Sequence, residues 1–107
     1  MPEEIEIAPQ SLQKMLDAKQ SFYFLDCREP QEHEVARIDG ATLIPMSELQ
    51  RRVDEIPKDR PVVVYCHHGI RSMNVTLWLR SNAVNAQSLA GGIDRWSAEI
   101  DPSVPRY

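Results

Sequence analysis

The stretch that decides the fold is Val62-Val63-Val64-Tyr65-Cys66-His67-His68-Gly69-Ile70-Arg71-Ser72. Residues 62–65 have high β propensity and run directly into Cys66, and a short loop with a glycine separates this cysteine from a predicted helix that Arg71 opens. Backbone N–H groups at a helix N-terminus point into such a loop, and the helix dipole adds roughly half a positive charge there. Because this field favours a thiolate, the pattern predicts a nucleophilic Cys66 held in an anion-binding loop.

Segments on both sides of this stretch alternate between strand and helix patterns. Strands are predicted over residues 5–7, 22–25, 41–44, 62–65 and 86–89, and a helical segment follows each of them. The segment after 22–25 is a short charged stretch, residues 31–36, of one or two helical turns. This order predicts an α/β fold with about five strands in a mostly parallel sheet and helices on both faces. Ligands bind such sheets beyond the carboxyl ends of the strands, where Cys66 and the segment 26–28 both fall.

Two local signals place the ends of predicted helices. Ser47 and Gln50 match a capping box at the start of the helix that precedes the central strand. Asn82 follows the helix that ends near residue 81, at the position of a left-handed residue that closes a helix.

Length and composition restrict the class of protein. The 107 residues predict one domain, 1–107, and a net charge of −4 argues against a nucleic-acid or membrane partner. No apolar run approaches the ~20 residues that span a bilayer, and the first residues are acidic, unlike a secretory signal. Cys27 and Cys66 are too few for a disulfide scaffold and lack zinc-site spacing, so we expect a cytoplasmic protein with no metal.

The chain resembles the rhodanese-like domain family over nearly its whole length. The matching stretches are Leu25-Asp26-Cys27-Arg28-Glu29, Asp39-Gly40-Ala41 with Ile44-Pro45, Tyr65-Cys66 through Ser72, and Gly91-Gly92-Ile93 with Trp96. The four residues between Cys66 and Arg71 are similar to the loop of sulfurtransferases, whereas related dual-specificity phosphatases have one more. The tail, residues 100–107, is similar to the end of rhodanese domains fused to ubiquitin-activating-like sulfur-carrier enzymes.

This resemblance implies a rhodanese-like fold and the transfer of sulfane sulfur without a cofactor. Cys66 would take sulfur from thiosulfate or a persulfide donor as a persulfide and pass it to a thiophilic acceptor. The implied protein partners are a cysteine desulfurase or a ubiquitin-like sulfur carrier. The implied binding loop and its supporting residues are His67, His68, Gly69, Ile70, Arg71 and Ser72, with Asp26 and Arg28.

The chain departs from the family pattern in two places. Ala36-Arg37-Ile38 replaces a frequent Gly-His-Ile, and His67 and His68 stand where many thiosulfate-using members carry Arg or Lys. Since histidine is only partly charged near neutrality, we expect weaker and pH-dependent affinity for thiosulfate. If these histidines help to bind the dianion, the rate of sulfur transfer from thiosulfate should fall as the pH rises through about 6–8.

Alternative interpretations remain open at the level of sequence. A structural ion pair is the favoured interpretation of Asp26 and Arg28, and a core position that of Cys27. A metal site at His67 and His68 is disfavoured, because adjacent side chains in a tight loop point in different directions. The second functional hypothesis is a sulfur-carrier or regulatory module that acts with a protein partner and shows little turnover of small molecules. The third, a phosphatase or arsenate reductase, is disfavoured because a tetrahedral oxyanion needs a roomier loop.

Overall fold

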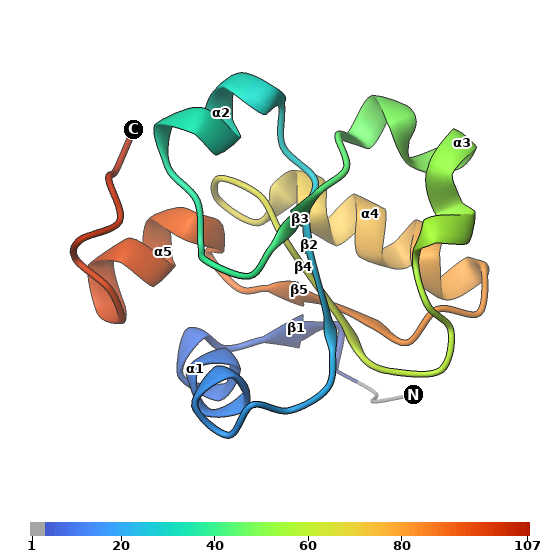
Figure 1. The fold of residues 1–107 in the computed structure, drawn as a ribbon, viewed down its shortest axis with the longest axis horizontal. Coiled ribbons are helices and arrows are strands. Elements are labelled where there is room, and N and C mark those ends of the chain that lie inside the picture. Colours follow the sequence, from blue (N-terminus) through green and yellow to red (C-terminus); the bar gives the residue numbers. More distant parts are fainter. Residues whose placement is uncertain (1–3) are drawn as a thin grey trace.

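A parallel five-stranded sheet forms the centre of the computed structural model, which describes residues 4–107 (Figure 1). The strand order is β1-β5-β4-β2-β3, and every neighbouring pair is parallel. The strands are β1 (Glu6–Ile7), β2 (Tyr23–Asp26), β3 (Thr42–Leu43), β4 (Val62–Tyr65) and β5 (Ala86–Leu89). The predicted α/β fold is therefore confirmed, and the sheet is wholly parallel within this part of the chain.

Helices cover both faces of the sheet (Figure 1). They are α1 (Pro9–Asp17), α2 (Pro30–Val35), α3 (Leu49–Arg52), α4 (Ile70–Ser81) and α5 (Gly92–Glu99), with 3₁₀ turns over Met46–Glu48 and Val53–Glu55. One apolar layer lies between the sheet and α3 with α4, and the other between the sheet and α1 with α5. None of the helices in residues 4–107 is long and apolar enough to cross a membrane.

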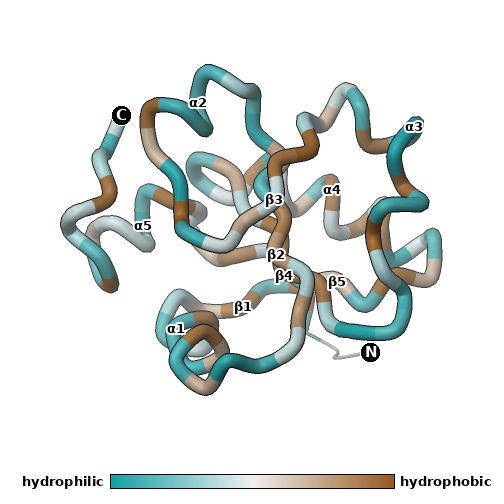
Figure 2. The backbone as a smooth tube through the Cα atoms, in the orientation of Figure 1, coloured by the Kyte–Doolittle hydropathy of each residue, from teal (hydrophilic) through white to brown (hydrophobic). Residues whose placement is uncertain are grey.

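The strand β4 is buried along its whole length because it lies in the middle of the sheet. Val62 and Val64 face the layer that contains α4, whereas Val63 and Tyr65 face the layer that contains α5. Figure 2 shows this apolar centre in brown, surrounded by hydrophilic turns and by α2. Burial on both faces explains why residues 62–65 form a continuous apolar run instead of an alternating one.

Two predicted helix ends are wrong in detail. Ser47 lies inside a 3₁₀ turn and caps no helix through its side chain, whereas Glu29 and Glu32 form a capping box at the start of α2. Asn82 has a φ of −105°, and the left-handed residue is the next one, Ala83, at +65°. Ala83 thus takes the role predicted for Asn82, because several positions near a helix end satisfy the same local pattern.

Candidate active site

Cys66 follows β4 at the carboxyl edge of the sheet, beside the end of β2. The register pairs Asp26 with Tyr65, and the Cys27 N–H donates to the Tyr65 carbonyl at 3.2 Å. The segment 26–28 and the Cys66 loop therefore lie next to each other, as expected for neighbouring parallel strands.

The Cys66 thiol lies inside a cradle made by its own loop. The N–H groups of Gly69 and Ser72 donate to Sγ at 3.1 and 3.3 Å, and Sγ lies 3.3 Å from Ser72 Oγ. Ser72 Oγ is in turn 2.7 Å from Ser88 Oγ on β5, and both serines are fully buried. These donors converge on one sulfur atom, which is the arrangement that stabilises a sulfur anion.

Two glycines let the backbone close around this thiol. Gly69 has a φ of +104° and precedes α4, and Gly92 has a φ of +61° and begins α5. A Cβ on Gly92 would lie 2.5 Å from the Cys66 carbonyl oxygen and 2.4 Å from that of His67. The start of α5 therefore packs directly against the loop, and the N–H of Ile93 donates to the Cys66 carbonyl at 2.9 Å.

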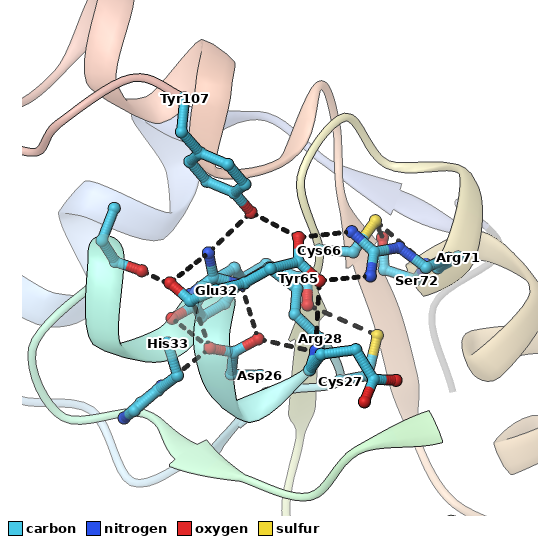
Figure 3. Close-up of polar contacts among 12 residues, drawn as sticks. Asp26, Cys27, Arg28, Glu32, His33, Tyr65, Cys66, Arg71, Ser72 and Tyr107 are labelled. Atoms are coloured by element: carbon cyan, nitrogen blue, oxygen red, sulfur yellow. Dashed lines mark hydrogen bonds and ion pairs between the residues drawn. The ribbon is translucent and has the colours of Figure 1, made fainter. Parts of the chain in front are cut away.

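Arg71 lies in the first turn of α4 and pairs with Glu32 of α2 (Figure 3). Nη1 donates to Oε1 at 2.7 Å and Nη2 to Oε2 at 2.8 Å. The Tyr107 hydroxyl donates to Glu32 Oε2 at 2.7 Å and accepts from Arg28 Nη1 at 2.8 Å. The hydrogen bonds from Arg71, and then that from Tyr107, lower the pKa of Glu32 to about 2 although partial burial opposes this.

Asp26 and Arg28 form a buried ion pair next to these contacts, and Arg28 links the two groups through Tyr107 (Figure 3). Arg28 Nε and Nη2 donate to the two carboxylate oxygens at 2.8 and 2.7 Å, and both side chains are fully buried. Burial favours the neutral carboxyl, but hydrogen bonds from Arg28 and His33 outweigh it, so the pKa of Asp26 lies below its usual value. Arg28 also donates to the carbonyl of Ala36 at 2.6 Å, which fixes the connection after α2.

The two loop histidines stack and differ in exposure. The His67 ring lies between His68 and Tyr107, with centroid distances of 3.9 and 3.8 Å. His67 Nε2 is buried and has no hydrogen-bond partner among the described residues. Burial, and then the neighbouring His68, lower the pKa of His67. The His68 side chain is 59% exposed, and its Nδ1 lies 3.9 Å from Asp94 Oδ2.

A depression of about 290 Å³ opens at this loop. Its lining residues are Cys66, His67, His68, Ile70 and Arg71. Ile70 is 76% exposed and forms part of the rim, although the Cys66 residue itself is only 1% exposed. Within residues 4–107, no three His, Cys, Asp or Glu side chains are grouped to hold a metal ion.

The structure brings together all of the predicted loop residues and adds three that sequence reasoning missed. These are Glu32, Ser88 and Tyr107, which contact Arg71, Ser72 and His67 respectively. A capping-box pattern at Glu29 and Glu32, with Pro30 between them, was available in the sequence and would have drawn attention to Glu32. No local pattern singles out Ser88 or Tyr107.

A parallel α/β sheet with a cysteine in an amide-lined loop defines the class of protein. Comparison with protein-family models matches residues 8–99 to the Rhodanese-like domain. The structure superimposes on a rhodanese-related protein from Thermoplasma volcanium with a TM-score of 0.83 and 30% identity, covering 95% of this chain and 98% of that one. The chain belongs to the rhodanese-like family.

Curated relatives in this family include proteins named as sulfurtransferases. A sulfurtransferase from Allochromatium vinosum is 36% identical over 100 residues, which cover 92% of this chain and 94% of the relative. The probable adenylyltransferase/sulfurtransferase MoeZ of Mycobacterium tuberculosis is 33% identical over 104 residues. That match covers 94% of this chain, which spans about a quarter of the length of MoeZ. Both of these relatives are thus named as sulfurtransferases.

Proposed function

We propose that this protein is a sulfurtransferase, a rhodanese-like domain over residues 1–107, in which Cys66 carries sulfane sulfur as a persulfide. The observation that carries the proposal is the cradle of Gly69 and Ser72 N–H groups, which donate to Cys66 Sγ at 3.1 and 3.3 Å. The first N–H groups of a helix have no acceptor within it, so those of Ile70 and Arg71 are further candidate donors to a terminal sulfur. Such donors stabilise an added anionic sulfur without a metal.

The transfer is a displacement at sulfur in two halves. The Cys66 thiolate attacks the outer sulfur of a donor R–S–SH, a new S–S bond forms, and RS⁻ leaves with the electron pair of the broken bond. With thiosulfate as donor, sulfite leaves in the same way and Cys66–S–S⁻ remains. An acceptor thiolate or cyanide then attacks the terminal sulfur and releases the Cys66 thiolate. No oxidant or reductant enters from outside, because the sulfane sulfur moves with its oxidation state unchanged.

The site residues take the following proposed roles. Cys66 is the catalytic nucleophile, and the loop that follows it, residues 67–72, binds the sulfur anion. Asp26 and Arg28 form a buried ion pair that supports the loop. Arg71 holds the beginning of α4 against α2 through Glu32.

Intact-mass spectrometry tests this proposal. The protein is incubated with thiosulfate or with an alkyl hydropersulfide, and the addition of one sulfur atom is expected, reversed by cyanide or dithiothreitol. Cys66→Ser should lose the adduct. Cys27→Ser is the matched control, because Cys27 is also buried but burial, and then Cys66 nearby, raise the pKa of its thiol and keep it protonated. An adduct that persists in Cys66→Ser contradicts the proposal.

A second candidate function is a sulfur-relay module that receives or delivers sulfur on a protein partner, such as a cysteine desulfurase or a ubiquitin-like sulfur carrier. Ile70, an apolar side chain 76% exposed at the rim of the depression, favours contact with a larger partner. Cyanide turnover beside sulfur delivery to such partners distinguishes the two functions, because fast turnover without a partner argues against the relay module. Two free thiols, Cys27 and Cys66, fit a reducing compartment, and we propose the cytoplasm.

A further inference from the structure

Among the residues that line the depression, Arg71 carries a permanent positive charge, and the carboxylate of Glu32 neutralises this charge. The two-point contact with Glu32 uses both terminal nitrogens of the guanidinium, at 2.7 and 2.8 Å. Glu32 is itself fixed, because Tyr107 Oη donates to Oε2 at 2.7 Å and the Glu29 N–H donates to Oε1 at 3.1 Å. The pair is therefore a fixed and electrically neutral unit at the edge of the site.

The other cationic side chains near the loop are compensated as well. Arg28 is paired with Asp26 and fully buried. The His67 ring is enclosed between two aromatic rings, and its buried Nε2 has no partner to stabilise a proton. His68 faces Asp94, whose carboxylate also accepts from Arg106 at 2.9 and 3.0 Å. Among the described residues that line the depression, none is a fixed cation without a carboxylate partner.

The remaining attraction for an anion comes from backbone N–H groups, and these converge on one sulfur atom. The donors from Gly69 and Ser72 reach Cys66 Sγ, deep in the loop, and are not spread over the rim. The rim instead carries Ile70, a branched apolar side chain that is 76% exposed. Such a site compensates one negative charge at the transferred sulfur and offers an apolar surface to the rest of the donor.

We infer that the site selects a persulfide donor with a carbon group next to its sulfur over the dianion thiosulfate, and that Glu32 sets this selection by neutralising Arg71. The inference deepens the proposed function and rests on it. Thiosulfate brings a sulfonate group to the rim, where the charge of Glu32 offsets the attraction that Arg71 would otherwise exert. Glu32 is thus a specificity-determining residue that need not touch the reacting atoms.

The test measures the second-order rate of sulfur addition to Cys66 by intact mass, with thiosulfate and with a small alkyl hydropersulfide. In Glu32→Gln the side chain keeps its shape and loses its charge, so thiosulfate addition should accelerate on the order of tenfold, whereas the alkyl hydropersulfide rate should change less than about threefold. The gain should fall at high salt because it is electrostatic. Glu34→Gln is the matched control, because it removes the same charge from an exposed position of α2 and should leave the ratio of the two rates unchanged.

A second variant decides the matter if Glu32→Gln does not fold. Ile70→Lys adds a cation at an exposed rim position, and it should accelerate thiosulfate addition without accelerating alkyl hydropersulfide addition. The inference is overturned if the ratio of the thiosulfate rate to the alkyl hydropersulfide rate is unchanged in folded Glu32→Gln. If Glu32→Gln does not fold, an unchanged ratio in Ile70→Lys overturns the inference. So does a wild-type protein that takes sulfur from thiosulfate as fast as from the alkyl hydropersulfide. If Cys66 takes sulfur from neither donor, the proposed function itself fails.

Discussion

Arg71 and Glu32 face each other in a two-point ion pair, with nitrogen–oxygen distances of 2.7 and 2.8 Å, and so join the first turn of α4 to α2. This pair does two things at once. It fixes the helix start whose N–H groups point at Cys66, and it removes the net charge that an unpaired arginine would place beside the thiol. The proposed preference for a persulfide donor over thiosulfate rests on both effects.

The Glu32–Arg71 pair should make stability depend on acid. The pKa of Glu32 is about 2 in the folded protein, against an ordinary value of 4.5, so its contribution is present above about pH 4.5 and is lost as the pH falls toward 2. Since Arg71 is 35% exposed, screening by water limits the contribution to about 1 kcal/mol. We expect Glu32→Gln to lower the free energy of urea unfolding at pH 6 and to approach the wild-type value near pH 2.5.

The exposed Glu34 on the same helix supplies the control for this experiment. Glu34→Gln should follow the wild-type protein at both pH values. A deficit in Glu32→Gln that stays constant from pH 6 to pH 2.5 would show that packing, and not the ionised carboxylate, accounts for the loss.

Gly92 should be the glycine least tolerant of substitution in the site. Alanine there must adopt a φ of +61° and place its Cβ 2.5 Å or less from the carbonyls of Cys66 and His67. The left-handed conformation alone costs about 1–2 kcal/mol, and displacement of the loop adds to it. We expect Gly92→Ala to lose more than about 2 kcal/mol of unfolding free energy and most of its sulfur addition.

Gly40→Ala separates these two costs. Gly40 has a φ of +91°, but a Cβ there meets nothing within 4 Å. This variant should lose only the conformational cost, about 1–2 kcal/mol, and should add sulfur at the wild-type rate. Equal losses of stability and activity in the two variants would contradict the role assigned to the contact between α5 and the Cys66 loop.

Tyr107 should stabilise the site through its hydroxyl and its ring separately. Tyr107→Phe removes the hydrogen bonds to Glu32 and from Arg28 but keeps the ring over His67, so we expect a loss of about 1 kcal/mol in unfolding free energy. Tyr107→Ala also uncovers His67, so the pKa of His67 should rise toward its ordinary value, measured by NMR titration. A His67 pKa that is the same in wild type and Tyr107→Ala would rule out this covering effect.

The fold, and the place of Cys66 at the end of the central strand, could be predicted from the sequence because both depend on local patterns. The apolar run of β4 ends directly at Cys66, and the glycine and helix start that follow are contiguous with it. The partner of Arg71 could not be predicted in this way, since Glu32 lies 39 residues away and Tyr107 lies 75 residues from Glu32. Many carboxylates in the sequence could pair with Arg71, and only the packing of α2 against the loop selects one of them.

The stacking of His67 changes the pH dependence that the sequence suggested. A loop histidine that binds thiosulfate should lose its charge over about pH 6–8. Burial between His68 and Tyr107, and then the proximity of His68, lower the pKa of His67 below its ordinary value of 6.5. His67 therefore loses its charge at a lower pH than an ordinary histidine, so its protonation assists a dianion only in more acid solution.

The rate of sulfur addition from thiosulfate should show this directly. Between about pH 7 and 8, wild type and His67→Gln should share one profile, and below about pH 6.5 the wild-type rate should exceed that of the variant as His67 gains its proton. Dividing one profile by the other isolates the contribution of the His67 side chain to the rate. His68→Gln serves as the control at the exposed neighbour. If the wild-type advantage over His67→Gln is already complete at pH 7, His67 is charged in the folded protein, and its enclosure by His68 and Tyr107 does not keep it neutral.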